Sequence, residues 1–361
     1  MLRRGDRMVT IKIENLERFI KDSFLQVGLE DIQARIAAKH MVFADSQGTD
    51  THGIIRLPIY IERIKKGLIK AKPQLKWEKQ TPNSAVLDGD QAIGHYAAHL
   101  AMQKATDKAK ENTIGIVTVY NGDHFGAAAC YSKMAADQGL IGFTTTNTSP
   151  LMAPTGGKER VLGNNPFSFA IPRESNYPIL LDMATSTVAA GKLILYQQKG
   201  EKIPYGWAVD KQGEPTTDPY AGLTGGGSLL PVGGYKGYGL SLIMDILCGV
   251  LSGASYGTNV NRLYDTNSNK PLGSGYMMMA INIESFISLY DFYARLEDLT
   301  SMVVNSPKQS HVDRIYLPGE IEDCVRKERS QNGVPINHQL HQELIQLSKE
   351  LEMNIQDYEF A

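Results

Sequence analysis

Helix-like and strand-like segments alternate in the middle of this chain, and the alternation limits the fold more than any other feature. Residues 94–112 have helical spacing, residues 114–120 form a short apolar run, residues 126–139 are helical again, and residues 140–147 are strand-like. This order is typical of the α/β class, because each helix covers one face of the sheet that its neighbouring strands build. With 361 residues, the chain can bury a substantial core of this kind.

Both ends of the chain have a helical pattern instead. Apolar residues recur three and four positions apart over residues 13–70, and residues 335–353 are amphipathic. We therefore expect the C-terminal segment to pack on another helical unit.

Charge and composition exclude several classes of partner. The 37 basic and 39 acidic residues nearly cancel, which argues against nucleic acid or an anionic membrane as the main partner. No apolar run approaches the ~20 residues of a membrane span. The basic start has no apolar region behind it, so we expect a short disordered segment before Val9 rather than a signal peptide. The scattered cysteines indicate a reducing cytoplasm: Cys130, Cys248 and Cys324.

Several familiar motifs are missing from the sequence. No G-x-G-x-x-G follows an early strand, and there is no G-x-x-x-x-G-K-[ST], so neither a standard Rossmann site nor a P-loop is indicated. H-E-x-x-H and G-x-S-x-G are also absent, which removes the signatures of zinc proteases and α/β-hydrolases.

The stretch GTDTHGIIR, residues 48–56, carries unusual polar side chains for a connection between helices. Pro58 is tolerated in the first turn of a helix, so His52 and Arg56 should lie close to a helix N-terminus, which favours anions. Arg56 could hold a carboxylate, Thr51 offers a hydroxyl, and His52 can exchange a proton near neutral pH. A simple helix cap with an exposed histidine is the competing interpretation.

A second histidine, His124, follows the predicted strand 114–120 in the stretch NGDHFG. Ligands of α/β sheets bind at the carboxyl ends of strands, and Gly122 and Gly126 would let a ligand approach the backbone. The residues alone leave open whether this turn is a site or a structural turn.

Other stretches give weaker signals. Asp182, at the end of a predicted strand, could orient a histidine, bind ribose or cap a helix. The glycine-rich turn around Lys236 is similar to a phosphate-binding loop, and LPGE at 317–320 reads as a turn before a helix. His95 and His99 lie four apart, as two metal ligands would, but no third ligand is near in sequence.

Taken together, seven stretches in the same order resemble the malate/L-lactate dehydrogenase family of NAD(P)-dependent oxidoreductases. The resemblance extends from about residue 10 to residue 330. The stretches are DTHGIIRLPIYIERIKKGLI, NGDHFGAAACYSKMA, TTTNTSPLMAPTGGKERVLGNNPFSFAIP, LDMATSTVAAGK, GWAVDKQGEPTTDP, LLPVGGYKGYGLSLIMDILCGVLSGA and LPGE. The family implies a non-Rossmann α/β fold with a mixed-sheet cofactor domain, homodimers, and hydride transfer between a nicotinamide and a carbon next to a carboxylate. It also implies a helical domain formed by residues 9–72 together with 335–361. This domain would pack on an α/β domain of residues 73–334, with further divisions near positions 125 and 290.

The resemblance also implies roles for individual residues. His52 would be the acid/base, Arg56 would hold the substrate carboxylate, and Thr51 stands where the family usually has serine. His124 would contact the cofactor and the reaction centre, and which histidine transfers the proton stays open. The residues expected to line the dinucleotide are His124, Thr148, Asp182, Met183, Ala184, Lys236, Gly319 and Glu320.

These features predict a cytoplasmic, NAD-dependent 2-hydroxyacid dehydrogenase with no metal, acting on malate or lactate, with NADP as the alternative cofactor. Ureidoglycolate is the alternative substrate. A metal-dependent hydrolase or lyase using His52, His95, His99 and His124 is the alternative from another class. A silent relative that only binds cofactor is the third hypothesis.

Overall fold

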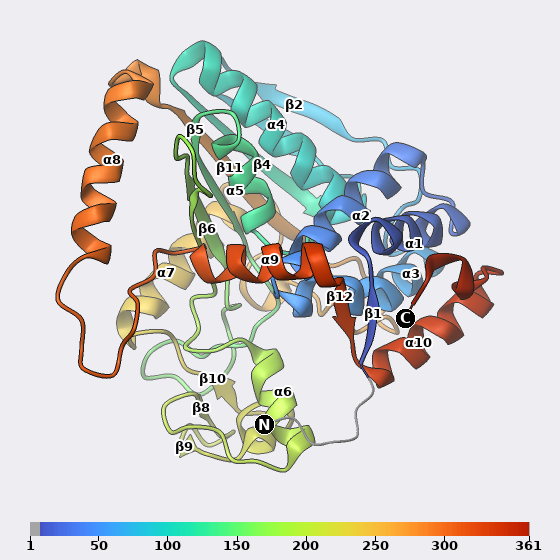
Figure 1. The fold of residues 1–361 in the computed structure, drawn as a ribbon. Helices are drawn as coiled ribbons and strands as arrows, with labels where there is room; N and C mark the ends of the chain where they lie inside the picture. Colours follow the sequence, from blue (N-terminus) through green and yellow to red (C-terminus); the bar gives the residue numbers. More distant parts are fainter. Residues whose placement is uncertain (1–7, 361) are drawn as a thin grey trace.

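A seven-stranded mixed sheet forms the centre of the molecule, as expected for a non-Rossmann α/β fold (Figure 1). The structure, a computed structural model, describes residues 8–360, so the expected disordered start falls almost wholly outside the described residues. The strand order is β2-β3-β4-β11-β5-β6-β7. The strands are β2 (Lys76–Gln80), β3 (Ser84–Asp88), β4 (Ile114–Gly122), β5 (Leu140–Thr146), β6 (Phe167–Ile171), β7 (Ile179–Met183) and β11 (Ser274–Asn282).

The strand β11 lies between β4 and β5 and runs antiparallel to both. The strands β3 and β4 pair in parallel, and β5, β6 and β7 form an antiparallel run. The helix–strand alternation therefore predicted the α/β class, but β4 and β5 are not direct neighbours, because a strand from much later in the chain separates them.

The helices α4 (Gly94–Asn112) and α5 (Ala129–Ala136) pack on this sheet. The inner face of α4 carries small residues four apart, including Ala97, Ala101 and Ala105, all fully buried. A side chain at Gly115 on β4 would collide with the Ala105 carbonyl. Small residues on both sides thus let the helix approach the strand closely.

A second core lies among helices from both ends of the chain. Leu16, Phe19 and Tyr60 are buried there with Leu344 and Leu347. The strands β1 (Val9–Ile11) and β12 (Val334–Ile336), not expected from the sequence, pair antiparallel and join the two ends. The helices involved are α1 (Ile13–Gln26), α2 (Asp31–Ser46), α3 (Leu57–Lys65) and α10 (His338–Glu350). The domain boundaries drawn from the sequence stay a prediction.

The turn-rich region between residues 147 and 235 contains more regular structure than its sequence indicated. A three-stranded sheet in the order β10-β8-β9 packs near the helix α6 (Ala190–Lys199), at the bottom of Figure 1. Its strands are β8 (Ala208–Val209), β9 (Pro215–Thr216) and β10 (Ser228–Leu229). Further on, the chain forms α7 (Tyr235–Asp245), continued by a π-helical turn (Ile246–Val250), and α8 (Leu289–Val304).

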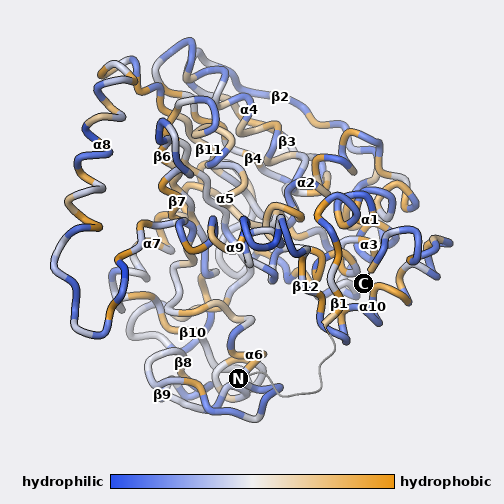
Figure 2. The backbone as a smooth tube through the Cα atoms, viewed as in Figure 1, coloured by the Kyte–Doolittle hydropathy of each residue, from blue (hydrophilic) through white to orange (hydrophobic). Residues whose placement is uncertain are grey.

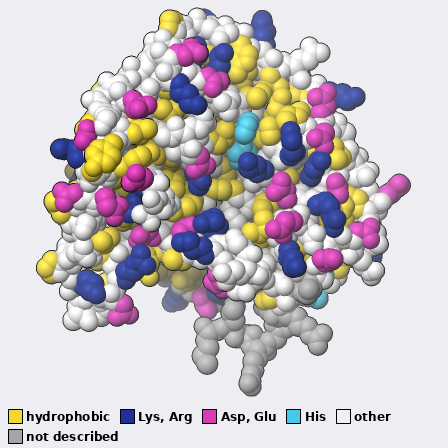
Figure 3. Space-filling model, turned by 45° about the horizontal axis from the view of Figure 1, so that its top comes forward, with side chains coloured by type: hydrophobic (Ala, Val, Ile, Leu, Met, Phe, Trp, Pro, Cys, Tyr) yellow, Lys and Arg dark blue, Asp and Glu magenta, His cyan; other side chains and the backbone are white. Residues whose placement is uncertain are grey.

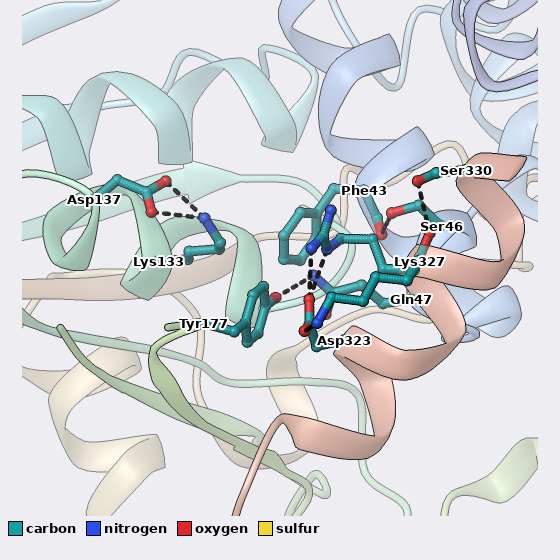
Figure 4. Close-up of polar contacts among 10 residues, drawn as sticks. Phe43, Ser46, Gln47, Lys133, Asp137, Tyr177, Asp323, Lys327 and Ser330 are labelled. Atoms are coloured by element: carbon teal, nitrogen blue, oxygen red, sulfur yellow. Dashed lines mark hydrogen bonds and ion pairs between the residues drawn. The ribbon is translucent and has the colours of Figure 1, made fainter. Parts of the chain in front are cut away.

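Helix α9 (Glu320–Asn332) crosses in front of the sheet and is mostly hydrophilic (Figure 2). Within the helix Asp323 pairs with Lys327 at 2.7 Å, and beside this pair Gln47 donates to the Tyr177 hydroxyl at 2.5 Å (Figure 4). Arg329, in the last turn of α9, pairs with Asp50 and so joins the helix to the turn that carries His52.

The surface carries both signs of charge. On the face in Figure 3, Lys and Arg side chains are interspersed with Asp and Glu rather than gathered. Within residues 8–360, no helix is both long and apolar enough to cross a membrane.

Candidate active site

His52 and Arg56 lie in two short 3₁₀ turns, Asp50–His52 and Ile54–Arg56, directly before α3 begins at Leu57. The buried Asp45 carboxylate accepts the backbone N–H of Ile54 at 2.8 Å and leaves no room for a side chain at Gly53. The buried carboxylate therefore fixes the turn. Helix α3 begins at Leu57 with Pro58 in its first turn, as predicted.

The side chains of this turn contact one another. Arg56 Nε donates to the Thr51 carbonyl at 2.6 Å, and the guanidinium also contacts the hydroxyl of Tyr264. The Thr51 hydroxyl lies 2.9 Å from His52 Nδ1, in a hydrogen bond. Arg56 is half-buried, so it offers donors to an incoming anion from a fixed position.

His124 lies two residues beyond the end of β4, in the loop that leads to α5. Asp123 next to it forms a buried ion pair with Arg63 of α3 at 2.6 Å, and its other oxygen accepts the His124 backbone N–H at 2.8 Å. The carboxylate thus fixes the loop at the strand end and joins it to α3. Burial raises the pKa of Asp123, while Arg63 opposes the rise.

The two predicted catalytic histidines come together although 71 positions separate them. Their ring centroids lie 5.7 Å apart in a stacked arrangement, with 21° between the planes. Burial, reinforced by Arg56, lowers the pKa of His52 to about 4, and the same causes lower the pKa of His124 well below its ordinary value. Both imidazoles are therefore neutral at pH 7 in the free protein.

The other two histidines of the metal hypothesis do not join them in a ligand set. His95 is fully buried with neither ring nitrogen hydrogen-bonded to a described residue, and its ring packs edge-on against Tyr60 at 5.3 Å. His99 instead hydrogen-bonds His40 at 3.0 Å. Within the described part of the chain, no three His, Cys, Asp or Glu side chains are placed to hold a metal ion.

The residues expected to line the dinucleotide gather around the end of β7. Asp182 accepts the backbone N–H of Ala129, the first residue of α5, at 3.1 Å. Desolvation by the surrounding protein raises the pKa of the Asp182 carboxyl to about 6. Met183 ends the strand opposite Phe167. Ala184 follows it and precedes Thr185, whose N–H donates to the carbonyl of Asn164.

The remaining predicted residues reach the same strand end. The Thr148 hydroxyl donates to the Asn164 side chain at 2.9 Å. Lys236 is exposed in the first turn of α7, and Val232 just before this helix donates to the Thr185 carbonyl at 2.9 Å.

Gly319 and Glu320 dock on the other side of β7. Pro318, directly before them, accepts the N–H of Leu180 at 2.9 Å. Gly319 has a φ of +89°, and a β-carbon there would lie 2.8 Å from that of Leu180, so only glycine fits without displacement.

Helix N-termini around this strand end suit an anionic cofactor. Helices α6 and α7 begin after segments that pair at Ser186 and Pro231, just beyond this strand end, and their N-cap residues are Ala189 and Gly234, which provide no capping side chain. The first N–H groups of a helix need acceptors, and a diphosphate provides them. A β-carbon added at Gly191 of α6 would lie 3.5 Å from the Thr51 methyl group. The start of α6 therefore lies close to the turn that carries His52.

The structure adds three residues to the candidate site that the sequence analysis did not single out. Tyr60, buried on α3, lies 2.6 Å from His124 Nδ1 in a hydrogen bond, and the sequence marked it only as part of a helical pattern. Asp45 was also part of a helical pattern, and Tyr264 lies in a turn-like segment. The one available signal was the four-residue spacing of Arg56 and Tyr60, which brings two side chains close together where a helix begins.

Comparisons with known proteins agree with this geometry. The model of the malate/L-lactate dehydrogenase family matches residues 11–345. A malate dehydrogenase of Pyrococcus abyssi is 40% identical over 351 residues, 95% of each chain. The ureidoglycolate dehydrogenase (NAD(+)) of Escherichia coli O157:H7 is 34% identical over 93% of this chain and 95% of its own. The solved structure of a Methanocaldococcus jannaschii sulfolactate dehydrogenase superposes with a TM-score of 0.91 at 40% identity, covering 97% of this chain and 99% of the other.

A mixed sheet without the dinucleotide fingerprint, with two histidines stacked beside the end of a strand, together with the family match, defines a non-Rossmann dehydrogenase of the hydroxyacid class. The chain belongs to the malate/L-lactate dehydrogenase family.

Proposed function

We propose that this protein interconverts a small 2-hydroxy acid and its 2-oxo acid with a nicotinamide cofactor. The observation that supports this most directly is the stacked pair of neutral histidines, His52 and His124, with Arg56 in the same turn as His52. A 2-hydroxy acid needs a cation for its carboxylate and a base for its hydroxyl, and these three side chains supply both.

Each residue has a distinct task in this proposal. Arg56 binds the substrate carboxylate through two N–H groups, and Thr51 orients His52 through the hydrogen bond to Nδ1. One histidine moves the proton of the hydroxyl, and the other contacts the reacting oxygen. The nicotinamide supplies or accepts the hydride when bound.

We propose NAD as the cofactor, with NADP as the alternative. The residues that would hold it lie along β7 and around its end, where the N-termini of α6 and α7 can bind the diphosphate. The residues concerned are His124, Thr148, Asp182, Met183, Ala184, Lys236, Gly319 and Glu320.

Malate is the proposed substrate, with lactate next. The support comes from the names of similar proteins, which include malate dehydrogenases at 40% and 37% identity. An L-sulfolactate dehydrogenase at 40% identity and a ureidoglycolate dehydrogenase at 34% identity suggest the alternative substrates, which differ from malate in the side group.

The test is a panel of 2-hydroxy and 2-oxo acids with each cofactor, followed at the absorbance of the reduced nicotinamide. We expect turnover on malate, and a fall of roughly 10²- to 10⁴-fold in kcat for His52→Gln or His124→Gln. His311→Gln, at an exposed position, is the matched control and should retain full activity. If no acid is turned over with either cofactor, the proposal fails.

A metal-dependent hydrolase or lyase is the rival from another class. It predicts that a chelator abolishes activity and that the active protein contains stoichiometric metal. Full dehydrogenase activity after exhaustive dialysis against chelator would exclude it.

We also propose a homodimer that works in the cytoplasm. Helix α7 and the turn after it expose Ile243, Val250 and Leu251 at 50%, 58% and 60%, an apolar face that a second copy would cover. Cys130, Cys248 and Cys324 are free thiols, which suits a reducing compartment. Sedimentation equilibrium of the wild type and of Val250→Asp tests the dimer, which the charge should dissociate.

A further inference from the structure

We propose that Tyr60 is a positioning residue for His124, fixing its ring and keeping the imidazole proton on Nε2 in the free enzyme. The inference rests on the proposed function, because it assigns His124 to the reaction centre. It concerns a contact between α3 and the loop after β4, two elements from different parts of the chain.

Two groups approach the same nitrogen of His124. The Tyr60 hydroxyl lies 2.6 Å from Nδ1, and the backbone N–H of Gly126 donates to Nδ1 at 3.3 Å. A backbone N–H can only donate, so Nδ1 must accept. A neutral imidazole that accepts at Nδ1 carries its proton on Nε2.

Tyr60 is a rigid partner. Its side chain is fully buried, and its ring packs at 87° against His95. Burial raises the pKa of the Tyr60 hydroxyl far above its ordinary value, so the phenol keeps its proton and can donate it in a hydrogen bond. The helix that carries Tyr60 is itself tied to the His124 loop by the Arg63–Asp123 pair.

This arrangement leaves Nε2 as the nitrogen that works on the substrate. With its proton there, His124 donates a hydrogen bond to the oxygen of a 2-oxo acid, where negative charge grows as hydride arrives. In the reverse direction the same Nε2–H stabilises the same developing negative charge on the substrate oxygen, so one tautomer serves both directions.

The proposal is tested first by ¹⁵N NMR of histidine-labelled wild-type protein without ligands, with the His124 signals assigned through His124→Gln. We expect an unprotonated Nδ1 and a protonated Nε2. A wild-type spectrum with the proton on Nδ1 would overturn the proposal, whatever the activity of the enzyme. Total inactivity of the wild type on every acid would instead overturn the proposed function alone, because this spectrum needs no turnover.

The variant Tyr60→Phe removes only the hydroxyl. We expect the two nitrogen signals of His124 to converge toward those of a tautomer mixture, and kcat to fall roughly 3- to 10-fold, as for one lost hydrogen bond, with KM for the 2-oxo acid unchanged.

Tyr131→Phe is the matched control. Tyr131 is equally buried, and its hydroxyl donates to the Phe125 carbonyl at 2.5 Å without contacting the imidazole. This variant should change neither the His124 signals nor kcat. An equal loss of kcat in both variants, or unchanged His124 signals in Tyr60→Phe, would show a merely structural role.

Discussion

His52 lies in surroundings that keep its imidazole neutral to a lower pH than a free histidine. Burial and the neighbouring Arg56 both disfavour the imidazolium and lower the pKa to about 4, against an ordinary value of about 6.5. Since a base must be neutral to take a proton, the form competent for hydroxy acid oxidation persists as the pH falls.

We therefore expect protonation of the histidine to lower kcat/KM for hydroxy acid oxidation only at pH values below 6.5. The measurement is kcat/KM from pH 4.5 to 8, which reports the free enzyme. The Asp182 carboxyl, whose pKa is about 6, titrates in the same range, and Asp182→Asn removes its effect from the pH profile. A limb at pH 6.5 that persists in Asp182→Asn would contradict the expectation.

Arg56 holds the substrate in the proposed mechanism by a planar pair of donors. Arg56→Lys retains the charge but loses the paired geometry, so KM for the acid should rise roughly 10- to 100-fold. Steady-state kinetics with malate measure this, with Arg35→Lys, exposed on α2, as the control. An unchanged KM would place the carboxylate elsewhere.

At the scale of elements, the segment from Gly257 to Gly273 covers the start of α3. Thr266 donates to Glu62 at 2.5 Å, and Arg63 donates to the Leu263 carbonyl at 3.2 Å, so the segment is fastened to the helix. These contacts place the ring of Tyr264 at 5.2 Å from the Arg56 guanidinium. The segment thus helps to hold Arg56 in position.

Tyr264→Phe keeps the ring and removes the hydroxyl that contacts Arg56. We expect KM for the acid to rise roughly 3- to 10-fold while kcat stays constant, because only substrate binding is weakened. Tyr256→Phe, at an exposed position just before the segment, serves as control. A fall in kcat at constant KM would assign Tyr264 to the chemical step instead.

The elements were predictable where the signal was local. Pro58 marked the start of α3, and the helical spacing of residues 94–112 gave α4 with the same bounds. The pairing of β1 with β12 and the position of β11 depend on contacts between distant segments, which no local pattern encodes. His52 and His124 could be proposed from residue type together with the family resemblance, whereas Tyr60 required a contact across 64 positions.

At the scale of the whole molecule, the Arg63–Asp123 ion pair links the helices near the chain ends to the central sheet. Both side chains are almost completely buried, at 0% and 1% exposure, and they join α3 to the end of β4. Removing one partner leaves an uncompensated charge, which typically destabilises a protein by about 3–5 kcal/mol.

We expect Arg63→Met to lose stability of that order in the free energy of unfolding in urea. Lys21→Met, in the exposed pair with Asp31, should lose about 1 kcal/mol or less. An equal decrease in the free energy of unfolding in the two variants would show that the buried pair stabilises the protein no more than the exposed pair.

The pairing of β1 with β12 also has a consequence for the order of synthesis. The ribosome makes Val334–Ile336 about 325 residues after its partner Val9–Ile11. At ~5–20 residues per second, roughly 16–65 s separate the two strands. Phe19 and Tyr60 lack their partners Leu344 and Leu347 for about as long. The nascent chain therefore exposes part of this apolar core during that interval, and the helical core closes only after Leu344 and Leu347 have been made.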